Sequence, residues 1–417
     1  MSVRSTIIET SRALVLQSLH SPSRLEPDGS GCLLPRLSQL AYEPIDSENG
    51  EIRLVELLPG QYDDGIQLNL HTRNLNDDIV YDALSYAWGT TNSSRRAIVN
   101  GCPVPVKESL GLGLRRLRVV DRSRILWIDA LCINQGDTRE RSHQVQQMAK
   151  IYKSANRVLI WLGEWPGCST CPNPEDCQTM WAQVLSFILE EYIQQDYTIG
   201  SQKRLKSLCA ASDHFIGHVM DICALPWFRR VWIIQEVVLP FADPLVFLGN
   251  QVFGFDAFGY AISNLEATFS HLWPKETLEE PEIVRTGGLG NRVAVLRRLR
   301  ERQGEHRRCL YWCLVLSRDA LATNPRDKVY GLLGICKFYV AEPILPDYSK
   351  SWLQVLAEAT RAMILDRLLI PYLAFAFPLE EHAGKESYLP SWLLDLSRMR
   401  TGFAGFWENS LSRYSDF

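Results

Sequence analysis

Two short apolar runs with a helical pattern between them occupy residues 125–164. The runs at 125–128 and 158–162 contain only apolar residues, as is typical of strands buried on both faces of a parallel sheet. Between the runs, apolar residues recur at helical spacing, at Val145, Met148, Ala149, Tyr152 and Ala155. The segment therefore predicts a strand, a helix and a second strand that is parallel to the first.

Polar residues and a glycine stand where these two predicted strands end. Asp129, Asn134 and Gln135 follow the first strand, and Gly163 and Glu164 follow the second. Ligands of open α/β sheets bind beyond the carboxyl ends of the strands. We therefore expect the functional site to draw on this edge of the sheet.

The segments around this unit also have clear local patterns. Residues 51–57 alternate as in a half-buried strand, and residues 81–90 are typical of a strand that ends in a glycine turn. Residues 97–104 carry an Asn-Gly pair between apolar segments, which predicts a hairpin. Residues 246–249 predict another buried strand. A helix is predicted before residue 125 by the spacing of Leu110, Leu114 and Leu117.

Composition limits the class of protein. The chain has 417 residues, enough for a large core and for two domains. The net charge of -4 and the pI near 6.1 predict no nucleic-acid partner. No apolar stretch approaches the ~18 residues that a membrane-spanning helix needs, so we expect no membrane span. The first residues lack a convincing secretory signal, and 11 cysteines are scattered along the chain, so we expect a reducing, cytoplasmic location.

Metal and hydrolase motifs are incomplete or missing in the sequence. Cys168, Cys171 and Cys177 include one C-x2-C spacing, with His214 and His218 as distant candidate ligands. A zinc site normally needs four ligands at a recognisable spacing, so we expect free thiols and no bound metal. The sequence contains no GxGxxG or P-loop pattern, no Gly-x-Ser-x-Gly elbow and no His-Glu-x-x-His helix.

Several motifs follow one another along the chain. They are YDALSYAWG at 81–89, LWIDALCINQ at 126–135, WFRRVW at 227–232, QE at 235–236, PRDKVYGLLG at 325–334, PDYS at 346–349 and LPSW at 389–392. In this order they resemble the fungal heterokaryon-incompatibility (HET) domain family over roughly residues 51–396. Gly136 departs from the family pattern, which usually has an acidic residue after the Asn-Gln pair.

The resemblance implies a fold and a domain organisation. The family is thought to be distantly related to Toll/interleukin-receptor (TIR) domains, some of which cleave NAD. It implies an α/β fold with a TIR-like (flavodoxin-like), largely parallel sheet flanked by helices, followed by a mainly helical C-terminal region. We expect a loosely ordered leader over residues 1–45, a HET domain over 46–250 and the helical region over 251–417.

The spacing of Trp232 and Glu236 resembles that of TIR enzymes, which place a tryptophan four residues before the catalytic glutamate. On a helix, this spacing puts both side chains on one face. The resemblance implies that Glu236 is catalytic, near the ribose of NAD, and that Trp232 belongs to the substrate-binding pocket. A carboxylate there can stabilise the positive charge that develops as nicotinamide leaves. The alternative is a structural Glu236 that pairs with Arg229 or Arg230.

Three further candidates for substrate binding carry rings or a positive charge. Tyr86 and Trp88 can stack on a flat base, or they can pack in the core. Arg141 can bind a phosphate through two parallel hydrogen bonds. Its alternative is an ion pair with Glu140 or Asp137.

The last three candidates follow the first strand of the central unit. Asp129 can contact a ribose, or it can tie down the loop that follows it. Asn134 and Gln135 can bind a ribose or a base, or they can close the same loop with hydrogen bonds.

Two functions follow from the resemblance. The first is a cell-death effector in fungal non-self recognition that acts by NAD cleavage through Glu236, as an NAD glycohydrolase. The alternative is a non-enzymatic signalling or scaffold module, in which the same pocket binds a nucleotide or a partner and controls assembly. We expect self-association under both, and no cofactor, since NAD is the implied substrate.

Overall fold

The computed structural model describes residues 42–46, 48–89, 95–165, 221–268, 289–301, 309–317 and 320–366, with a few residues between 173 and 206. The chain divides into two compact units. The first unit comprises residues 1–135, 155–167 and 241–255, and the second comprises residues 136–154, 168–240 and 256–417. Outside the described residues lie nearly all of the predicted leader at 1–45 and the whole motif at 389–392. The domain boundaries expected from the sequence stay predictions.

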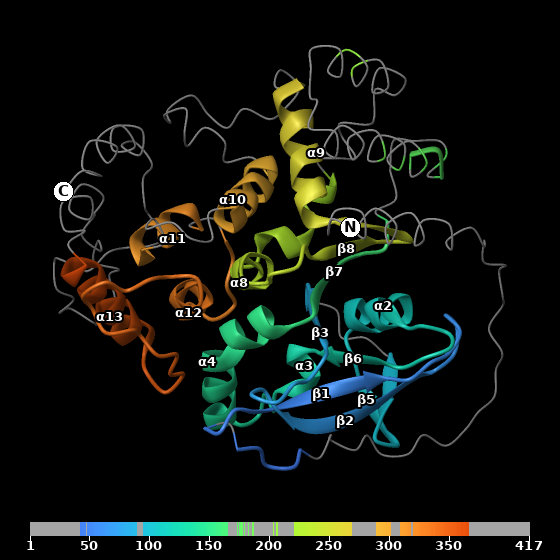
Figure 1. Cartoon of the computed structure of the whole chain (residues 1–417), viewed down its shortest axis with the longest axis horizontal. Coiled ribbons are helices and arrows are strands. Elements are labelled where there is room, and N and C mark those ends of the chain that lie inside the picture. The colour runs from blue at the N-terminus through green and yellow to red at the C-terminus, as the bar shows by residue number, and fades with distance from the viewer. Residues whose placement is uncertain are drawn as a thin grey trace, which may run out of the picture. The chain divides into compact units, whose positions relative to one another are not determined.

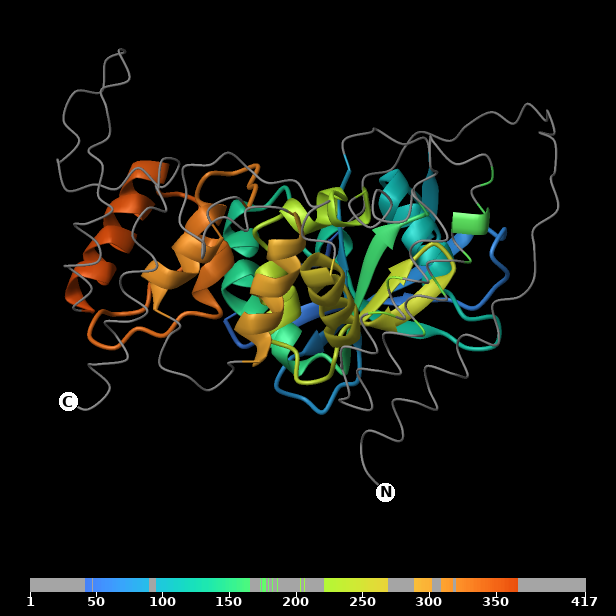
Figure 2. The same cartoon turned by 90° about the horizontal axis from the view of Figure 1, so that it is seen from above.

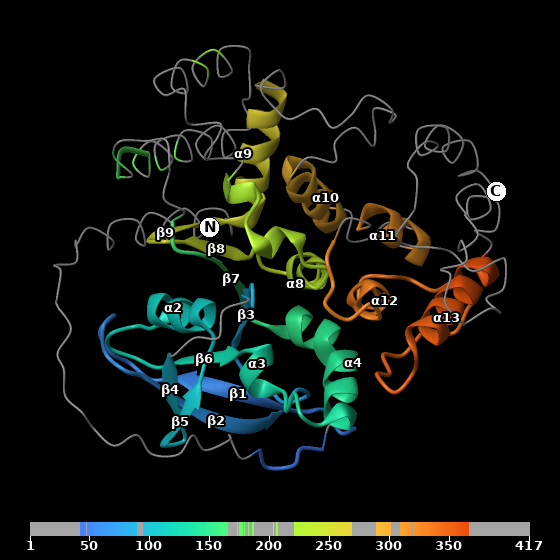
Figure 3. The same cartoon turned by 180° about the vertical axis from the view of Figure 1, so that it is seen from behind.

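The described part of the first unit is built around a nine-stranded sheet (Figure 1). Its strands are β1 (Glu51–Leu57), β2 (Ile66–Asn74), β3 (Asp82–Tyr86), β4 (Arg96–Val99), β5 (Cys102–Pro105), β6 (Arg124–Trp127), β7 (Arg157–Gly163), β8 (Leu245–Leu248) and β9 (Gln251–Gly254). Their order across the sheet is β5-β4-β2-β1-β6-β3-β7-β8-β9. Figure 3 shows β4 and β9 with labels.

The four neighbouring strands β6, β3, β7 and β8 run parallel to one another. Along the chain these four strands come in the order β3, β6, β7, β8. Across the sheet they therefore lie in the order second, first, third and fourth. Most of the other neighbours are antiparallel, with β2 and β4 as the exception. The α/β class is therefore confirmed, but the sheet is mixed rather than largely parallel. The reason is that short connections join β1 to β2, β4 to β5 and β8 to β9, and short connections produce antiparallel pairs.

Local patterns are confirmed in several elements. Residues 51–57 form β1, and the predicted hairpin is the β4–β5 pair. Its two turn residues, Asn100 and Gly101, have φ of 49° and 79°, as the favoured two-residue hairpin turn requires. The strands predicted from residues 125–164 are β6 and β7, and β3 lies between them in the sheet.

Helix α2 (Glu108–Leu117) packs against β7 and β2 in the first unit. The predicted leucine positions of this helix, Leu110, Leu114 and Leu117, are at most 2% exposed. At Gly113 a Cβ atom would lie 2.9 Å from Cδ1 of Trp161 in β7. The helix therefore approaches the strand closely because glycine has no side chain there.

The described elements of the second unit are helical (Figure 2). They are α4 (Thr138–Ser154), the 3-10 helix η1 (Pro226–Arg229), α8 (Ile233–Val238), α9 (Phe255–Thr268, which starts at the unit boundary), α10 (Leu289–Glu301), α11 (Leu310–Leu316), α12 (Asp327–Leu333) and α13 (Trp352–Leu365). All residues of α8 are buried, and this helix packs against α4, α10 and α12.

Candidate functional site

The carboxyl ends of β3 and β7 are neighbours at one edge of the parallel strands. From β3 the chain proceeds to β6 on one side, and from β6 it proceeds to β7 on the other side of β3. Such a reversal of direction is a topological switch point, where open α/β sheets bind their ligands. The sheet edge at which the sequence predicts a ligand site is therefore the carboxyl end of β3 and β7, in the first unit.

Trp88 and Asp129 meet at this edge. Trp88 follows β3, and Asp129 is the first residue of helix α3 (Asp129–Cys132), just after β6. The indole Nε1–H of Trp88 donates to Oδ2 of Asp129 at 2.8 Å, and Oδ1 accepts from the backbone N–H of Ala130 at 2.7 Å. Tyr86 is 2% exposed, whereas Trp88 is half-buried. Trp88 is therefore partly exposed, Asp129 holds its ring in place, and stacking of either residue on a base stays a prediction.

The loop that follows β6 closes around Asp129. The side-chain amide of Gln135 donates to the backbone carbonyl of Asp129 at 3.1 Å. Arg53, a buried residue of β1, donates from Nη1 to the carbonyl of Cys132 at 3.1 Å. Asn134 is half-buried within the same loop. The loop-closing interpretation of Gln135 is thus supported, and ligand binding by Asn134 and Gln135 stays a prediction.

In the second unit, Trp232 and Arg141 gather around Asp327, the first residue of α12. Asp327 accepts from the indole Nε1–H of Trp232 at 3.2 Å and from the hydroxyl of Tyr348 at 2.7 Å. The guanidinium carbon of Arg141 lies 4.6 Å from the ring centroid of Tyr348. Burial raises the pKa of Asp327, while the two hydrogen bonds and the positive charge of Arg141 act in the opposite direction. The cluster therefore has a half-buried carboxylate at its centre.

Sequence reasoning did not single out Asp327 as a site residue. It was present in the PRDKVYGLLG motif at residues 325–334, which contributed to the family resemblance. Its hydrogen-bond partner Trp232 is 95 residues away along the chain. Spacing could not reveal a contact of that range.

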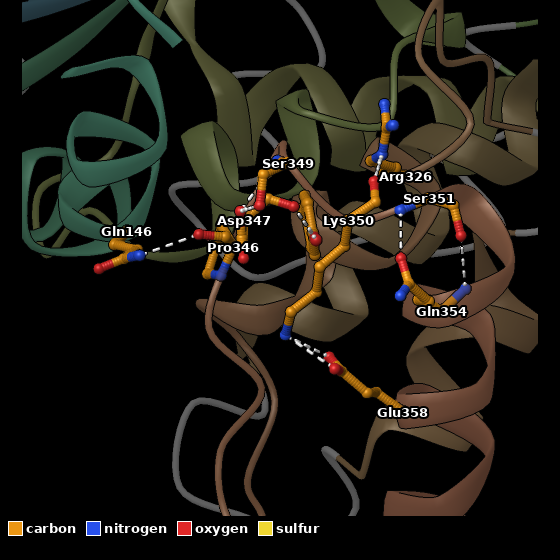
Figure 4. A network of polar contacts seen from close by, with 10 residues as sticks. Gln146, Arg326, Pro346, Asp347, Ser349, Lys350, Ser351, Gln354 and Glu358 are labelled. Atoms are coloured by element: carbon orange, nitrogen blue, oxygen red, sulfur yellow. Dashed lines mark hydrogen bonds and ion pairs between the residues drawn. The ribbon is translucent and has the colours of Figure 1, made fainter. Parts of the chain in front are cut away.

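Tyr348 belongs to a turn formed by residues 346–349, and its hydroxyl donates to this carboxylate. Figure 4 shows Pro346, Asp347 and Ser349 of this turn. Oδ1 of Asp347 accepts from the backbone N–H and the hydroxyl of Ser349 at 2.9 and 2.6 Å. The carbonyl of Pro346 accepts from Nε2 of Gln146 in α4 at 2.9 Å. The PDYS motif therefore joins α4 to the segment before α13.

Glu236 lies one helical turn after Trp232, and its backbone N–H donates to the carbonyl of Trp232 at 3.4 Å. The segment is helical from Ile233, with Trp232 as the residue before the helix. Its side chain is 2% exposed, and Oε1 lies 3.9 Å from Nη1 of Arg230. The pairing with Arg230 is thus present, and the catalytic role of Glu236 stays a prediction.

Among the described residues, no group of three His, Cys, Asp or Glu side chains is placed to hold a metal ion. Cys177 is buried, and the other residues considered for zinc lie outside the described ranges. None of the described helices is both long and apolar enough to span a bilayer.

Comparisons with known proteins agree with the motifs. The family model of the heterokaryon incompatibility protein (HET) matches residues 81–236, a range that contains all the candidate site residues predicted from the sequence. Heterokaryon incompatibility protein 6, OR allele, of Neurospora crassa is 27% identical over 362 residues. That alignment covers 77% of this chain and 52% of the relative, so the chain spans about half of the relative's length. No solved structure matches the chain. Residues 81–236 therefore match the HET domain, and the resemblance seen in the sequence motifs is confirmed.

Proposed function

We propose that the protein acts in fungal non-self recognition and regulated cell death, and that it does so by cleaving NAD with Glu236 as the catalytic carboxylate. The biological role is supported by the HET match and by the name of the relative from Neurospora crassa. The chemistry rests on one observation. Trp232 and Glu236 lie one turn apart at helix α8, inside the matched range.

The strand order supports a TIR-like relationship. The parallel strands lie in the order second, first, third, fourth along the sheet, as in flavodoxin-like folds. In that comparison β3 is the first strand and β7 is the third. Helix α8 then follows the third strand, where TIR enzymes carry their catalytic glutamate.

Glu236 would act on the bond between the ribose C1′ and the nicotinamide nitrogen. That bond breaks with its electron pair leaving on nicotinamide, and water adds to C1′ and releases a proton. The carboxylate stabilises the positive charge that develops on the ribose. Because Glu236 is 2% exposed, the residues around α8 must rearrange before a substrate reaches its side chain. Of the residues predicted to bind the nucleotide, Arg141 and Trp232 belong to the same unit as Glu236. The others belong to the first unit, and they are Tyr86, Trp88, Asp129, Asn134 and Gln135.

The test is nicotinamide release from NAD by the purified chain, measured for the wild type and for Glu236→Gln. The substitution keeps the shape of the side chain and removes the negative charge, so we expect turnover to fall by at least about a hundredfold. The assay also includes concentrated and artificially clustered protein, because self-association is part of the proposal. Absence of turnover under all these conditions would exclude the enzyme. Equal turnover in both forms would exclude Glu236.

A second candidate is a non-enzymatic signalling or scaffold module, and a specific contact favours it. The side chain of Glu236 is buried, with Arg230 at 3.9 Å, as a structural ion pair would be. If this is its role, Glu236→Gln and Arg230→Gln will both lower the melting temperature, and neither the wild type nor the variants will release nicotinamide.

A further inference from the structure

We infer that the carboxyl edge of β3 is a nucleotide subsite, in which Trp88 stacks on a flat ring and Lys107 binds a phosphate. The inference rests on the proposed function for the class of ligand, because NAD carries two flat rings joined by a pyrophosphate. It concerns binding and not bond cleavage. Lys107 was not a candidate from the sequence, since a lysine before a helix is ordinary.

Trp88 is a rigid stacking surface. Its indole Nε1–H is held by Oδ2 of Asp129 at 2.8 Å, and that carboxylate is itself fixed by the backbone of Ala130. The ring is half-buried, so part of it faces outward. An aromatic side chain that is already oriented loses little entropy when a ligand stacks on it. The role of Asp129 in this subsite is therefore to orient Trp88.

Lys107 places a positive charge beside this ring. It directly precedes α2, and its Nζ lies 5.8 Å from the ring centroid of Trp88. Nζ donates to the carbonyl of Gly89 at 3.0 Å, which occupies one of the three N–H groups of an ammonium. Within the described ranges no salt bridge involves Lys107, and its side chain is exposed. Its charge is therefore available to an anion.

Among the described residues, the backbone is open at the glycine whose carbonyl accepts from Lys107. Gly89 has φ of +70°, and no described atom lies within 4 Å of the place where its Cβ would be. The same holds for Gly163 at the end of the neighbouring β7, with φ of +120°. Glycines at such positions allow a ligand to approach the main chain closely. Both stand at the switch point, where α/β sheets bind ligands.

One nearby acidic group has to be considered. Glu108 follows Lys107 and would repel a phosphate. Its carboxylate pairs with Arg95 at 3.6 Å, however, which offsets its charge. The Glu108–Arg95 pair therefore does not oppose an anionic ligand, and the carboxylate of Asp129 at the same site accepts from Trp88 and from the backbone N–H of Ala130.

Isothermal titration of the full chain with ADP, adenosine and inorganic pyrophosphate tests the subsite. ADP contains the flat ring and the phosphates but no nicotinamide bond, so binding is measured independently of cleavage. We expect ADP to bind more tightly than adenosine. The difference between the two affinities should become smaller at high salt, because salt screens the charge of the phosphates. Lys107→Gln should weaken ADP binding about tenfold and leave adenosine unchanged. Trp88→Leu should weaken both.

Lys153→Gln is the matched control, because Lys153 is an exposed lysine in the last turn of α4. Circular dichroism melting confirms that each variant folds. The inference fails if the wild type binds no ADP, or if Lys107→Gln and Lys153→Gln bind ADP equally. It also fails if pyrophosphate binds as tightly as ADP and Trp88→Leu changes neither of these two affinities. Such a result would describe an anion site in which no ring stacks on Trp88. Missing NAD turnover with intact ADP binding would count against the proposed cleavage and leave the subsite standing.

Discussion

Asp327 holds together three segments of the second unit that are distant in sequence. It accepts hydrogen bonds from Trp232 and from Tyr348, and Arg141 lies over the ring of Tyr348. A carboxylate that is partly withdrawn from water is costly without such partners, and burial raises the pKa of Asp327 in spite of its two hydrogen bonds. Its contribution to stability therefore depends on the two donors that it satisfies.

Asp327→Ala is expected to lower the free energy of unfolding by about 1–3 kcal/mol, because the indole N–H and the tyrosine hydroxyl lose their acceptor. Urea unfolding measures the change. Asp221→Ala removes an exposed aspartate of the same unit and should stay within about 0.5 kcal/mol of the wild type. If the two variants unfold alike, the cluster around Asp327 contributes nothing to stability.

The sequence predicted several residues of the site, but it did not predict the hydrogen bonds between them. Trp88 and Asp129 were both candidates, because each follows a predicted strand. The hydrogen bond between them spans 41 residues and exists because β3 and β6 are neighbours in the sheet. Periodicity in a single sequence identifies strands without saying which strands are neighbours. Lys107 and Asp327 were missed for the same reason, since their partners come from other elements.

At the scale of elements, helix α2 shows how a glycine sets the distance between a helix and a strand. At Gly113 a Cβ would lie 2.9 Å from the ring of Trp161, which is 1% exposed and has no room to move. At Gly111 the nearest atom would be Cδ of the flexible Arg95, at 3.1 Å. The two glycines therefore differ in what an added methyl group would displace.

Gly113→Ala is expected to destabilise the protein by about 1–3 kcal/mol, because overpacking against Trp161 outweighs the roughly 1 kcal/mol that alanine gains over glycine in a helix. Gly111→Ala should be near neutral or stabilising, because Arg95 can move aside. Thermal unfolding of the two variants checks the difference. A Gly113→Ala protein that melts at or above the wild-type temperature would contradict the close packing of α2 on β7.

The elements that were predicted are those with a strong local pattern. Residues 51–57, the Asn-Gly hairpin and the two strands of the 125–164 unit are confirmed as β1, β4–β5, β6 and β7. Strand β2 was not predicted, although Ile66, Leu68 and Leu70 alternate with polar residues as in a half-buried strand. The mixed character of the sheet was missed because strand direction depends on the length of connections and on pairing between distant residues.

At the scale of the whole molecule, the HET match covers less than the sheet that contains it. Strand β6 pairs with β1 (Glu51–Leu57), which lies before the matched range of 81–236. Strand β7 pairs with β8 (Leu245–Leu248), which lies after it. Asp327, the partner of Trp232, also lies beyond the range. The matched segment therefore depends on flanking residues for its neighbours in the sheet and for its buried contacts.

A fragment limited to residues 81–236 is expected not to fold as a monomer. It would leave β6 and β7 with unpaired backbone groups along one side, and exposed strand edges promote association between chains. It would also uncover apolar residues of the central strands, which are almost fully buried in the chain, such as Leu126 and Ile160. Sedimentation velocity and thermal melting, with the full chain as the control, test this. A fragment that sediments as a monomer and melts cooperatively would show that the matched segment is an independent domain and that the flanking strands are additions to it.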